Sequence, residues 1–255
     1  MNIVSSKIQF VINGDDFGMS SAVNQAILYA FQNRLISSST MMANMPGYEE
    51  ACALIETHNL RGRVGVHINL VEGVPLSAPI RECRRFCSDD GAFSGHLLKR
   101  ALRLSHSEER ALHVEMSAQI EHCLDRGIVP THLDSHHHYH TSWPIGTVLI
   151  QVARQYKIGA IRLNRNCGPY RSSAKSIFRT IYNYRLRLNS LAGTDYFGNY
   201  GDFDRMCQKR QGIVEMVLHP RLNSENKVID LEEGRELSAM IEGLGSIEMV
   251  PYLHQ

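Results

Sequence analysis

Short apolar runs alternate with longer segments of helical periodicity along the chain. The apolar runs predict strands at residues 8–12, 38–43, 64–70, 131–133, 160–163 and 212–218, with a weaker one at 247–252. Apolar residues three or four positions apart predict helices over 23–31, capped by Ser20 or Ser21, over 108–126, and from Pro144 onward. The chain is therefore expected to alternate strands with helices.

This alternation is typical of a parallel α/β fold, and both an open doubly wound sheet and a (β/α) barrel fit it. Polar residues at the ends of different strands favour the barrel, because there these ends converge on one mouth. They are Asp15, Asp16, His67, the segment 132–140, Arg162 and His219. We expect one domain over residues 1–255, a variant (β/α) barrel, TIM-barrel-like and seven-stranded or distorted, with its site at the C-terminal strand ends.

Composition excludes several classes of protein. Lys+Arg 27 against Asp+Glu 26 leaves a formal charge of +1 in 255 residues, which argues against a strongly basic nucleic-acid binder and an acidic disordered tail. The longest apolar runs fall short of the roughly 20 residues of a membrane span. Six scattered cysteines and an N-terminus unlike a signal peptide predict a cytoplasmic protein with free thiols.

The densest chemical signal is the segment 132–140, which holds five of the thirteen histidines together with Asp134. Imidazole nitrogen is a common ligand of zinc and related divalent ions, so this block after a strand indicates a metal site. His132, His136 and His140 recur at four-residue spacing. The alternative is a solvated polar loop that binds metal only loosely.

A second signal is the pair Asp15-Asp16, which directly follows the first predicted strand. Two adjacent carboxylates repel each other unless a cation lies between them or one is protonated. With a divalent ion, one carboxylate binds the metal and the other is free to act as a base toward water. The alternative is an Asx turn in which Gly18 supplies a positive backbone angle.

Two further histidines complete the predicted site. His67 lies within the strand at 64–70, and as a metal ligand it would complete an Asp-His-His set that leaves positions open for water. His219 ends a late apolar strand before Pro220, where it could protonate a leaving group. A satisfied core histidine and a solvent-facing histidine are the respective alternatives.

These motifs resemble the YdjC/ChbG family of carbohydrate deacetylases. The resemblance rests on Asp15-Asp16-Phe17-Gly18, Gly65-x-His67, the histidine block from Thr131 to His140, and His219-Pro220. It implies a variant (β/α) barrel that removes acetyl groups from N-acetylated sugars with one divalent metal ion, Mg or Zn. By motif, the resemblance implies that Asp16, His67 and His136 are the metal ligands, Asp15 the base and His219 the acid.

Other residues are assigned to the surroundings of this site. The resemblance implies that Arg162 lies beside the catalytic carboxylate, where its charge would keep Asp15 ionised. Asp134 could orient a ligand imidazole from behind. His138, His140 and Trp143 follow the block, and Trp143 could stack on a sugar ring or pack in the core.

Two other functions stay open at this point. One is a phosphoesterase-type metal hydrolase on the same barrel, in which two or three ions would use the whole histidine block. The other is a catalytically inactive sugar-binding homologue, whose mark would be loss of the base, although Asp15 is present. A homo-oligomer is also left open.

Charge is segregated along the chain. Between residues 135 and 194 there is no Asp or Glu but nine Lys or Arg, and segment 172–191 mixes them with aromatic and aliphatic residues. This segment could lie as a peripheral helix on the inner face of an anionic membrane, or hold the phosphate of a nucleotide- or lipid-linked sugar. A solvated basic helix face is the alternative. The expected substrate is an N-acetylated sugar or glycoconjugate.

Overall fold

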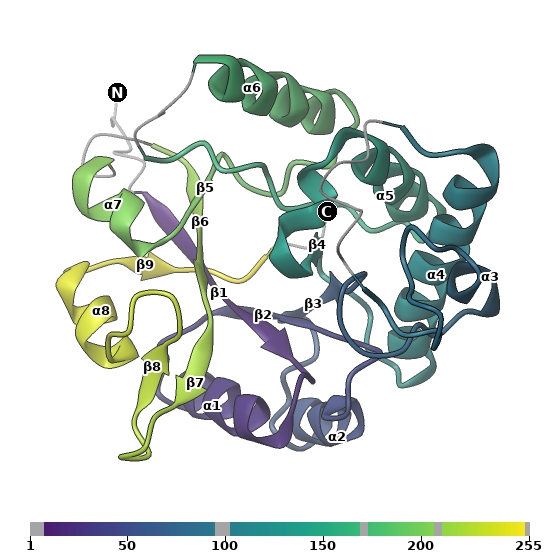
Figure 1. Ribbon diagram of the computed structural model, residues 1–255. Coiled ribbons are helices and arrows are strands. Elements are labelled where there is room, and N and C mark those ends of the chain that lie inside the picture. The colour runs from purple at the N-terminus through teal and green to yellow at the C-terminus, as the bar shows by residue number, and fades with distance from the viewer. Residues whose placement is uncertain (1–7, 95–102, 169–172, 207–210, 253–255) are drawn as a thin grey trace.

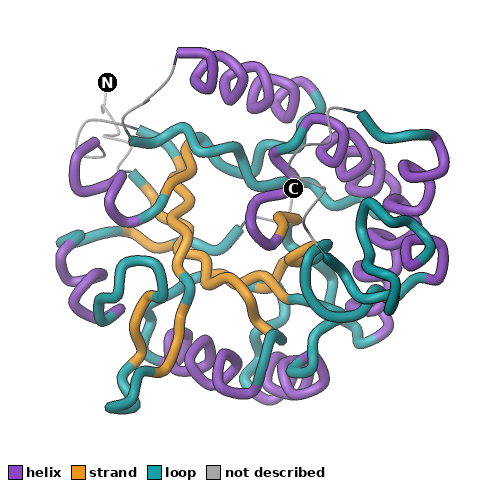
Figure 2. The backbone as a smooth tube through the Cα atoms, in the orientation of Figure 1, coloured by secondary structure: helices purple, strands orange, loops and turns teal. Residues whose placement is uncertain are grey.

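A curled parallel sheet forms the centre of the molecule (Figures 1 and 2). The computed structural model describes residues 8–94, 103–168, 173–206 and 211–252. The sheet order is β4-β3-β2-β1-β6-β5, and β9 pairs with the start of β1. The strands are β1 (Gln9–Phe17), β2 (Ser38–Met41), β3 (Val64–Ile68), β4 (Leu133–Ser135), β5 (Tyr196–Gly198), β6 (Ile213–Leu218) and β9 (Glu248–Met249).

Helices lie around the outside of this sheet (Figure 2). They are α1 (Ser21–Gln32), α2 (Tyr48–Thr57), α3 (Ala78–Arg81), α4 (His106–Asp125), α5 (Trp143–Gln155), α6 (Ser173–Leu188), α7 (Tyr200–Met206) and α8 (Leu237–Gly243). A short 3-10 segment η2 (His136–Thr141) follows β4, and a hairpin of β7 (Pro220–Leu222) and β8 (Val228–Asp230) follows β6. Every residue of β2, β3 and β4 is buried, as expected for parallel strands covered on both faces.

Local signals set several of these boundaries, and the cap predicted for α1 is one of them. Ser20 caps α1, because its hydroxyl accepts a hydrogen bond from the backbone N–H of Val23 at 3.4 Å. Helix α4 begins with a capping box between Ser105 and Glu108, and Gly127 follows its end with a φ of 68°. The α/β class and the strand–helix alternation are confirmed.

The variant (β/α) barrel is confirmed in part, since the sheet forms a curled half-barrel. The strand predicted at 160–163 is wrong: Ile161 makes only isolated bridges, to Leu133 of β4 and to Ala192. The chain then leaves the ladder, because the N–H of Asn164 donates to the side chain of Asn183 at 2.7 Å. The strand predicted at 247–252 shortens to the two residues of β9.

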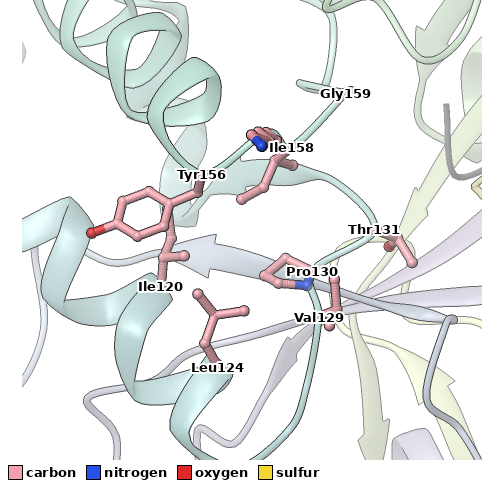
Figure 3. A pocket seen from close by; sticks show the side chains of 9 residues that line it. Ile120, Leu124, Val129, Pro130, Thr131, Tyr156, Ile158 and Gly159 are labelled. Atoms are coloured by element: carbon pink, nitrogen blue, oxygen red, sulfur yellow. The ribbon is translucent and has the colours of Figure 1, made fainter.

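One small cavity, of about 70 Å³, lies between α4 and the segments 129–131 and 156–159 (Figure 3). Its lining mixes apolar side chains such as Ile120, Leu124 and Ile158 with polar groups, and Lys157 is its one charged residue. The histidines and carboxylates predicted for the site lie elsewhere, so we do not assign chemistry to this cavity. The five cysteines in the described residues are free thiols, as predicted, and Cys207 lies outside those residues.

Candidate metal centre and catalytic cleft

A cleft of about 540 Å³ opens at the C-terminal ends of β1 and β6 and the start of η2. Its lining is Asp15, Asp16, Met19, Glu72, His136, His137, His138, His219, Arg221, Leu231 and Glu232. These residues come from segments more than 200 positions apart, and most carry charge or imidazole. The convergence of strand ends therefore assembles a polar site, as the barrel hypothesis predicts.

A bulge at the end of β1 turns two consecutive carboxylates toward this cleft. Along a regular strand, Asp15 and Asp16 would point to opposite faces of the sheet. The pairing of β1 with β2 shifts register between Gly14 and Phe17, and Asp16 has a φ of 73°. This backbone position is costly for a residue with a Cβ, and bulges often re-aim side chains at functional sites. Both carboxylates line the cleft as a result.

Three predicted metal ligands meet at one point. Oδ1 of Asp16 lies 2.9 Å from Nδ1 of His136 and 3.3 Å from Nε2 of His67. All three ligand atoms lie within 4.8 Å of one another and all three residues are buried. Yet Asp16 Oδ1 has no partner in hydrogen-bond geometry among the described residues. Because a buried carboxylate oxygen is rarely left unsatisfied, this donor set fits a cation bound between the three groups.

The neighbours of His67 favour the tautomer that a metal ligand needs. Its Nδ1 lies 2.7 Å from Oδ1 of Asp134 and 3.2 Å from the hydroxyl of Thr40. With the proton held at Nδ1, the lone pair of Nε2 faces Asp16. Asp134 thus lies behind the imidazole of His67, a predicted metal ligand.

The negative charge around His67 also favours a cation. Burial opposes protonation of the ring, but Asp134 and Asp15 outweigh it and raise the pKa of His67 to about 10. Burial likewise opposes ionisation of Asp16, yet His136 and His67 hold the pKa of its carboxyl below the usual range. The pocket therefore stabilises ionised carboxylates together with an added positive charge.

Asp15 is held by a buried guanidinium. Nη1 and Nη2 of Arg162 each donate to one carboxylate oxygen of Asp15 at 2.7 Å, and the side-chain amide of Asn13 donates to the same group at 2.8 Å. Burial would raise the pKa of Asp15, but Arg162 and then His67 outweigh that effect and lower it. The carboxylate is therefore ionised and fixed in orientation, which suits a base.

Arg162 also contacts two further carboxylates. Its Nη1 lies 2.6 Å from Asp134, and its Nε donates to Glu215 at 2.6 Å. Glu215 lies in β6 and accepts a short hydrogen bond from the hydroxyl of Tyr252. One guanidinium thus contacts three buried acids. Burial raises the pKa of Glu215 from its ordinary 4.5 to about 7, although the charge of Arg162 opposes this rise.

His219 lies across the cleft from the ligand set and close to Asp15. Its Nε2 is 4.0 Å from Oδ2 of Asp15, and its backbone N–H donates to Asp230 at 2.6 Å. The side chain of His219 is partly exposed, whereas Asp15 is buried. A substrate nitrogen in the cleft could therefore reach the His219 ring.

Sequence patterns did not single out several residues of the site. Nη2 of Arg221, on the hairpin after His219, lies 2.7 Å from Oδ2 of Asp16. Glu72 lies 3.3 Å from Nε2 of His136 and forms a second group of potential ligands with His136 and His137. Glu215 could have been found, since an acid inside the apolar run of β6 must be paired.

The histidine block divides into separate roles. His132 and His140 are fully buried. His132 stacks on Tyr252 at 3.6 Å between ring centroids, and Nδ1 of His140 lies 2.7 Å from the hydroxyl of Ser135. His138 lines the cleft, and burial followed by Arg162 lowers its pKa to about 3. It is therefore neutral at physiological pH.

Trp143 is not brought to the cleft. Its ring packs under the guanidinium of Arg185, 4.5 Å from the centroid, on the outside of the molecule. It lines neither the cleft nor the neighbouring cavity of about 280 Å³, which shares His138 and Glu232 with the cleft. The suggestion that Trp143 stacks on a sugar ring therefore has no support in this geometry.

A family model described as "YdjC-like protein" matches residues 9–243, which is most of the chain. The chain belongs to the YdjC family. This confirms the resemblance inferred from the aspartate pair and the histidine block. It also covers every predicted ligand and catalytic residue of the site, from Asp15 to His219.

Curated relatives of this YdjC-family chain carry the name carbohydrate deacetylase. One from Brevibacillus brevis is 31% identical over 97% of the chain and 95% of its own length. Relatives from Geobacillus stearothermophilus and Halalkalibacterium halodurans are 36% and 37% identical over 66% and 59% of the chain. These two alignments cover 64% and 62% of the relatives, so the chain spans less than two thirds of their length.

A solved structure shares the fold. A crystal structure from Enterococcus faecalis V583, called a cellobiose-phosphate cleavage protein, superposes with a TM-score of 0.73. The match covers 97% of this chain and 98% of the other at 20% sequence identity. At that identity, the likeness establishes the architecture alone.

Proposed function

We propose that this protein is a metal-dependent deacetylase, which hydrolyses the N-acetyl group of an acetamido sugar to acetate and a free amine. One observation carries the proposal: Asp16 Oδ1 is buried, has no hydrogen-bond partner among the described residues and faces His67 and His136, beside an Asp15 that Arg162 keeps ionised. The name shared by the curated relatives supports the same substrate class.

Asp16, His67 and His136 would hold one divalent ion. Two imidazoles and a carboxylate suit zinc, and magnesium is the other candidate. When bound, such an ion supplies Lewis acidity toward the amide carbonyl and lowers the pKa of a nearby water. Three protein ligands leave coordination positions open, as a catalytic site requires.

The chain's own residues would carry the proton transfers. Asp15 accepts a proton from the attacking water as the new C–O bond forms at the acetyl carbon. Arg162 keeps Asp15 in place and ionised until that moment. His219 then donates a proton to the sugar nitrogen as the C–N bond breaks, so that the amine leaves neutral.

The test is release of acetate from N-acetylglucosamine and its short oligosaccharides, measured beside bound-metal content. The Asp15→Asn variant should lower kcat at least about 10³-fold, in the range of lost general-base catalysis and electrostatics, while one ion per chain is retained. Asp125→Asn, at the exposed end of α4, is the matched control and should leave kcat unchanged. If the wild-type enzyme with its metal releases no acetate from any acetamido sugar, the proposal fails.

A second candidate is a phosphoesterase-type hydrolase. It is favoured by the second ligand group of Glu72, His136 and His137, which could hold another ion beside the first. Metal stoichiometry separates the two candidates. One ion per chain supports the deacetylase, whereas two ions per chain, with the second lost in Glu72→Gln, would support the phosphoesterase. Hydrolysis of an aromatic phosphate ester by the wild-type protein would then identify the phosphoesterase activity directly.

A further inference from the structure

Helix α6 presents an apolar stripe to the solvent. Ile177, Ile181, Tyr184 and Leu188 are between 51% and 67% exposed, and their spacing of four, three and four residues places them on one face. The opposite face is also apolar, because Tyr182 and Leu186 are buried. A surface helix normally has a polar outer face, so the stripe is unexplained by packing within the described residues.

Basic and aromatic side chains border this stripe. Arg185 and Arg187 lie on its two sides in the helical projection, and Arg185 covers the ring of Trp143, itself 44% exposed. Phe178 adds another exposed ring on the side of Trp143. We call the residues Trp143, Ile177, Phe178, Ile181, Tyr184, Arg185, Arg187 and Leu188 the α6 patch. Residue 172 and Arg171 lie outside the described residues.

We propose that the α6 patch docks on the surface of an anionic lipid bilayer. Helices that lie in the membrane interface combine an apolar face with flanking Lys or Arg and an aromatic residue such as Trp. The apolar side chains would enter the headgroup boundary, and each basic residue would gain attraction to anionic lipid. No described helix combines the length and apolar character needed to cross a bilayer, and α6 has 16 residues.

The charge of the α6 patch favours a lipid bilayer over a second copy of this chain as its binding partner. Two α6 patches packed against each other would bring arginines of both copies together. The α6 patch itself holds no acidic residue. Asp195, whose backbone carbonyl accepts a hydrogen bond from Arg187 at 3.0 Å, has its carboxylate bound to the backbone N–H of Ile213. Like charges at an interface are unfavourable, whereas phosphate groups of anionic lipids complement the patch.

The same helix borders the candidate active site. Arg179, on α6, lines the cavity of about 280 Å³ that shares His138 and Glu232 with the cleft. A docked α6 would therefore hold this cavity, which adjoins the cleft, close to the membrane surface. Resting on the proposed function, this points to an acetamido sugar attached to a lipid carrier as the substrate class.

The test is co-sedimentation of the purified protein with vesicles of phosphatidylcholine, with and without phosphatidylglycerol. The wild-type protein should sediment with the phosphatidylglycerol vesicles, and less so at high salt. Ile181→Asp should lower the partition coefficient at least about tenfold, because it replaces an apolar group that would enter the membrane by a negative charge, which anionic lipid repels. Val114→Asp, at a 43% exposed position of α4, is the matched control and should bind as wild type.

Three outcomes would overturn the inference. They are absence of binding to phosphatidylglycerol vesicles, binding that Ile181→Asp does not weaken, and a solution dimer that Ile181→Asp dissociates. The last would assign the patch to self-association. Unchanged far-UV circular dichroism and melting temperature of Ile181→Asp would show that the variant is folded.

Acetate release from soluble N-acetylglucosamine oligosaccharides keeps this inference distinct from the proposed function. Ile181→Asp should leave that activity unchanged, because residue 181 lines neither cavity. A protein that releases acetate but does not bind vesicles would contradict membrane docking and leave the proposed deacetylase function intact. A protein that binds vesicles but releases no acetate from any acetamide would support membrane docking and contradict a lipid-linked acetamido sugar as the substrate.

Discussion

Arg162 donates a hydrogen bond to each carboxylate oxygen of Asp15 at 2.7 Å, although 147 residues separate the two in the sequence. The pair is almost completely buried, and Arg162 also contacts Asp134 and Glu215. The base of the proposed reaction is therefore linked through Arg162 and Asp134 to His67, a proposed metal ligand. Among the charged groups around Asp15, Arg162 has the largest effect in keeping its carboxyl ionised, and it contacts both carboxylate oxygens.

Replacing Arg162 should accordingly impair catalysis more than binding. Arg162→Lys keeps the charge but cannot make both bonds to Asp15, so we expect kcat to fall about 10²-fold with little change in KM. Arg154→Lys, on the exposed face of α5, is the control and should behave as wild type. Steady-state kinetics on an N-acetylated oligosaccharide would measure both, and an effect on KM alone would contradict a role in holding the base.

Asp134 should set the metal affinity through His67. Asp134→Asn removes the charge 2.7 Å from Nδ1 of His67, and loss of such a partner typically weakens metal binding about 10–100-fold. Competition with a chromophoric chelator measures the dissociation constant directly. Asp89→Asn, at an exposed loop position, serves as the comparison. If wild type and Asp134→Asn bind the metal with equal affinity, Asp134 does not strengthen metal binding through His67.

Glu215 should make the fold less stable as the pH rises. Its pKa is about 7 in the folded protein against 4.5 ordinarily, so the folded state binds more protons between these values. Stability from this group is full below about pH 4.5 and declines until about pH 7, by on the order of 3 kcal/mol. Urea unfolding from pH 5 to 8 should show the stability of wild type falling relative to that of Glu215→Gln, which lacks this carboxyl.

An exposed glutamate provides the matched comparison for that experiment. Glu56→Gln, on α2, should differ from wild type by a constant free energy of unfolding across the same pH range. If the difference between wild type and Glu215→Gln is also constant, the buried carboxyl does not take up a proton on folding.

Gly65 should be sensitive to a single methyl group. A Cβ there would lie 2.5 Å from the carbonyl oxygen of His132 and 2.6 Å from its Nδ1, so β3 and the segment before β4 would be forced apart. We expect Gly65→Ala to lose about 1–3 kcal/mol of unfolding free energy and to bind metal more weakly, because His67 lies two residues on. Gly201→Ala is the control.

Gly201 lies in α7 and its nearest neighbours to a new Cβ are 3.7 Å away or more. Alanine is the better helix former, so that variant should be neutral or slightly more stable. Thermal unfolding and metal titration of both variants would check this. A Gly65→Ala protein as stable as wild type would show that the two strands can separate without cost.

The amino-acid sequence determined the α/β class, the capped start of α1 and the polar strand ends, because each depends on neighbours a few residues apart. It also indicated the metal ligands and the Asp15–His219 pair, since dense histidines and paired aspartates are unusual without a cation. It did not reveal the contacts of Glu215 and Arg221, which depend on the strand order that brings β1, β6 and the hairpin together.

Tertiary structure alone decided three further points. A register shift in one strand pair turned Asp15 and Asp16 to the same side, against the alternation that a strand pattern predicts. In the strand expected at 160–163, Ile161 makes only isolated bridges, and the side chain of Asn183 binds the backbone N–H and C=O of Asn164 directly after it. The outward face of α6 was decided by which of its two apolar sides packed inward, and local periodicity alone does not distinguish two apolar faces of one helix.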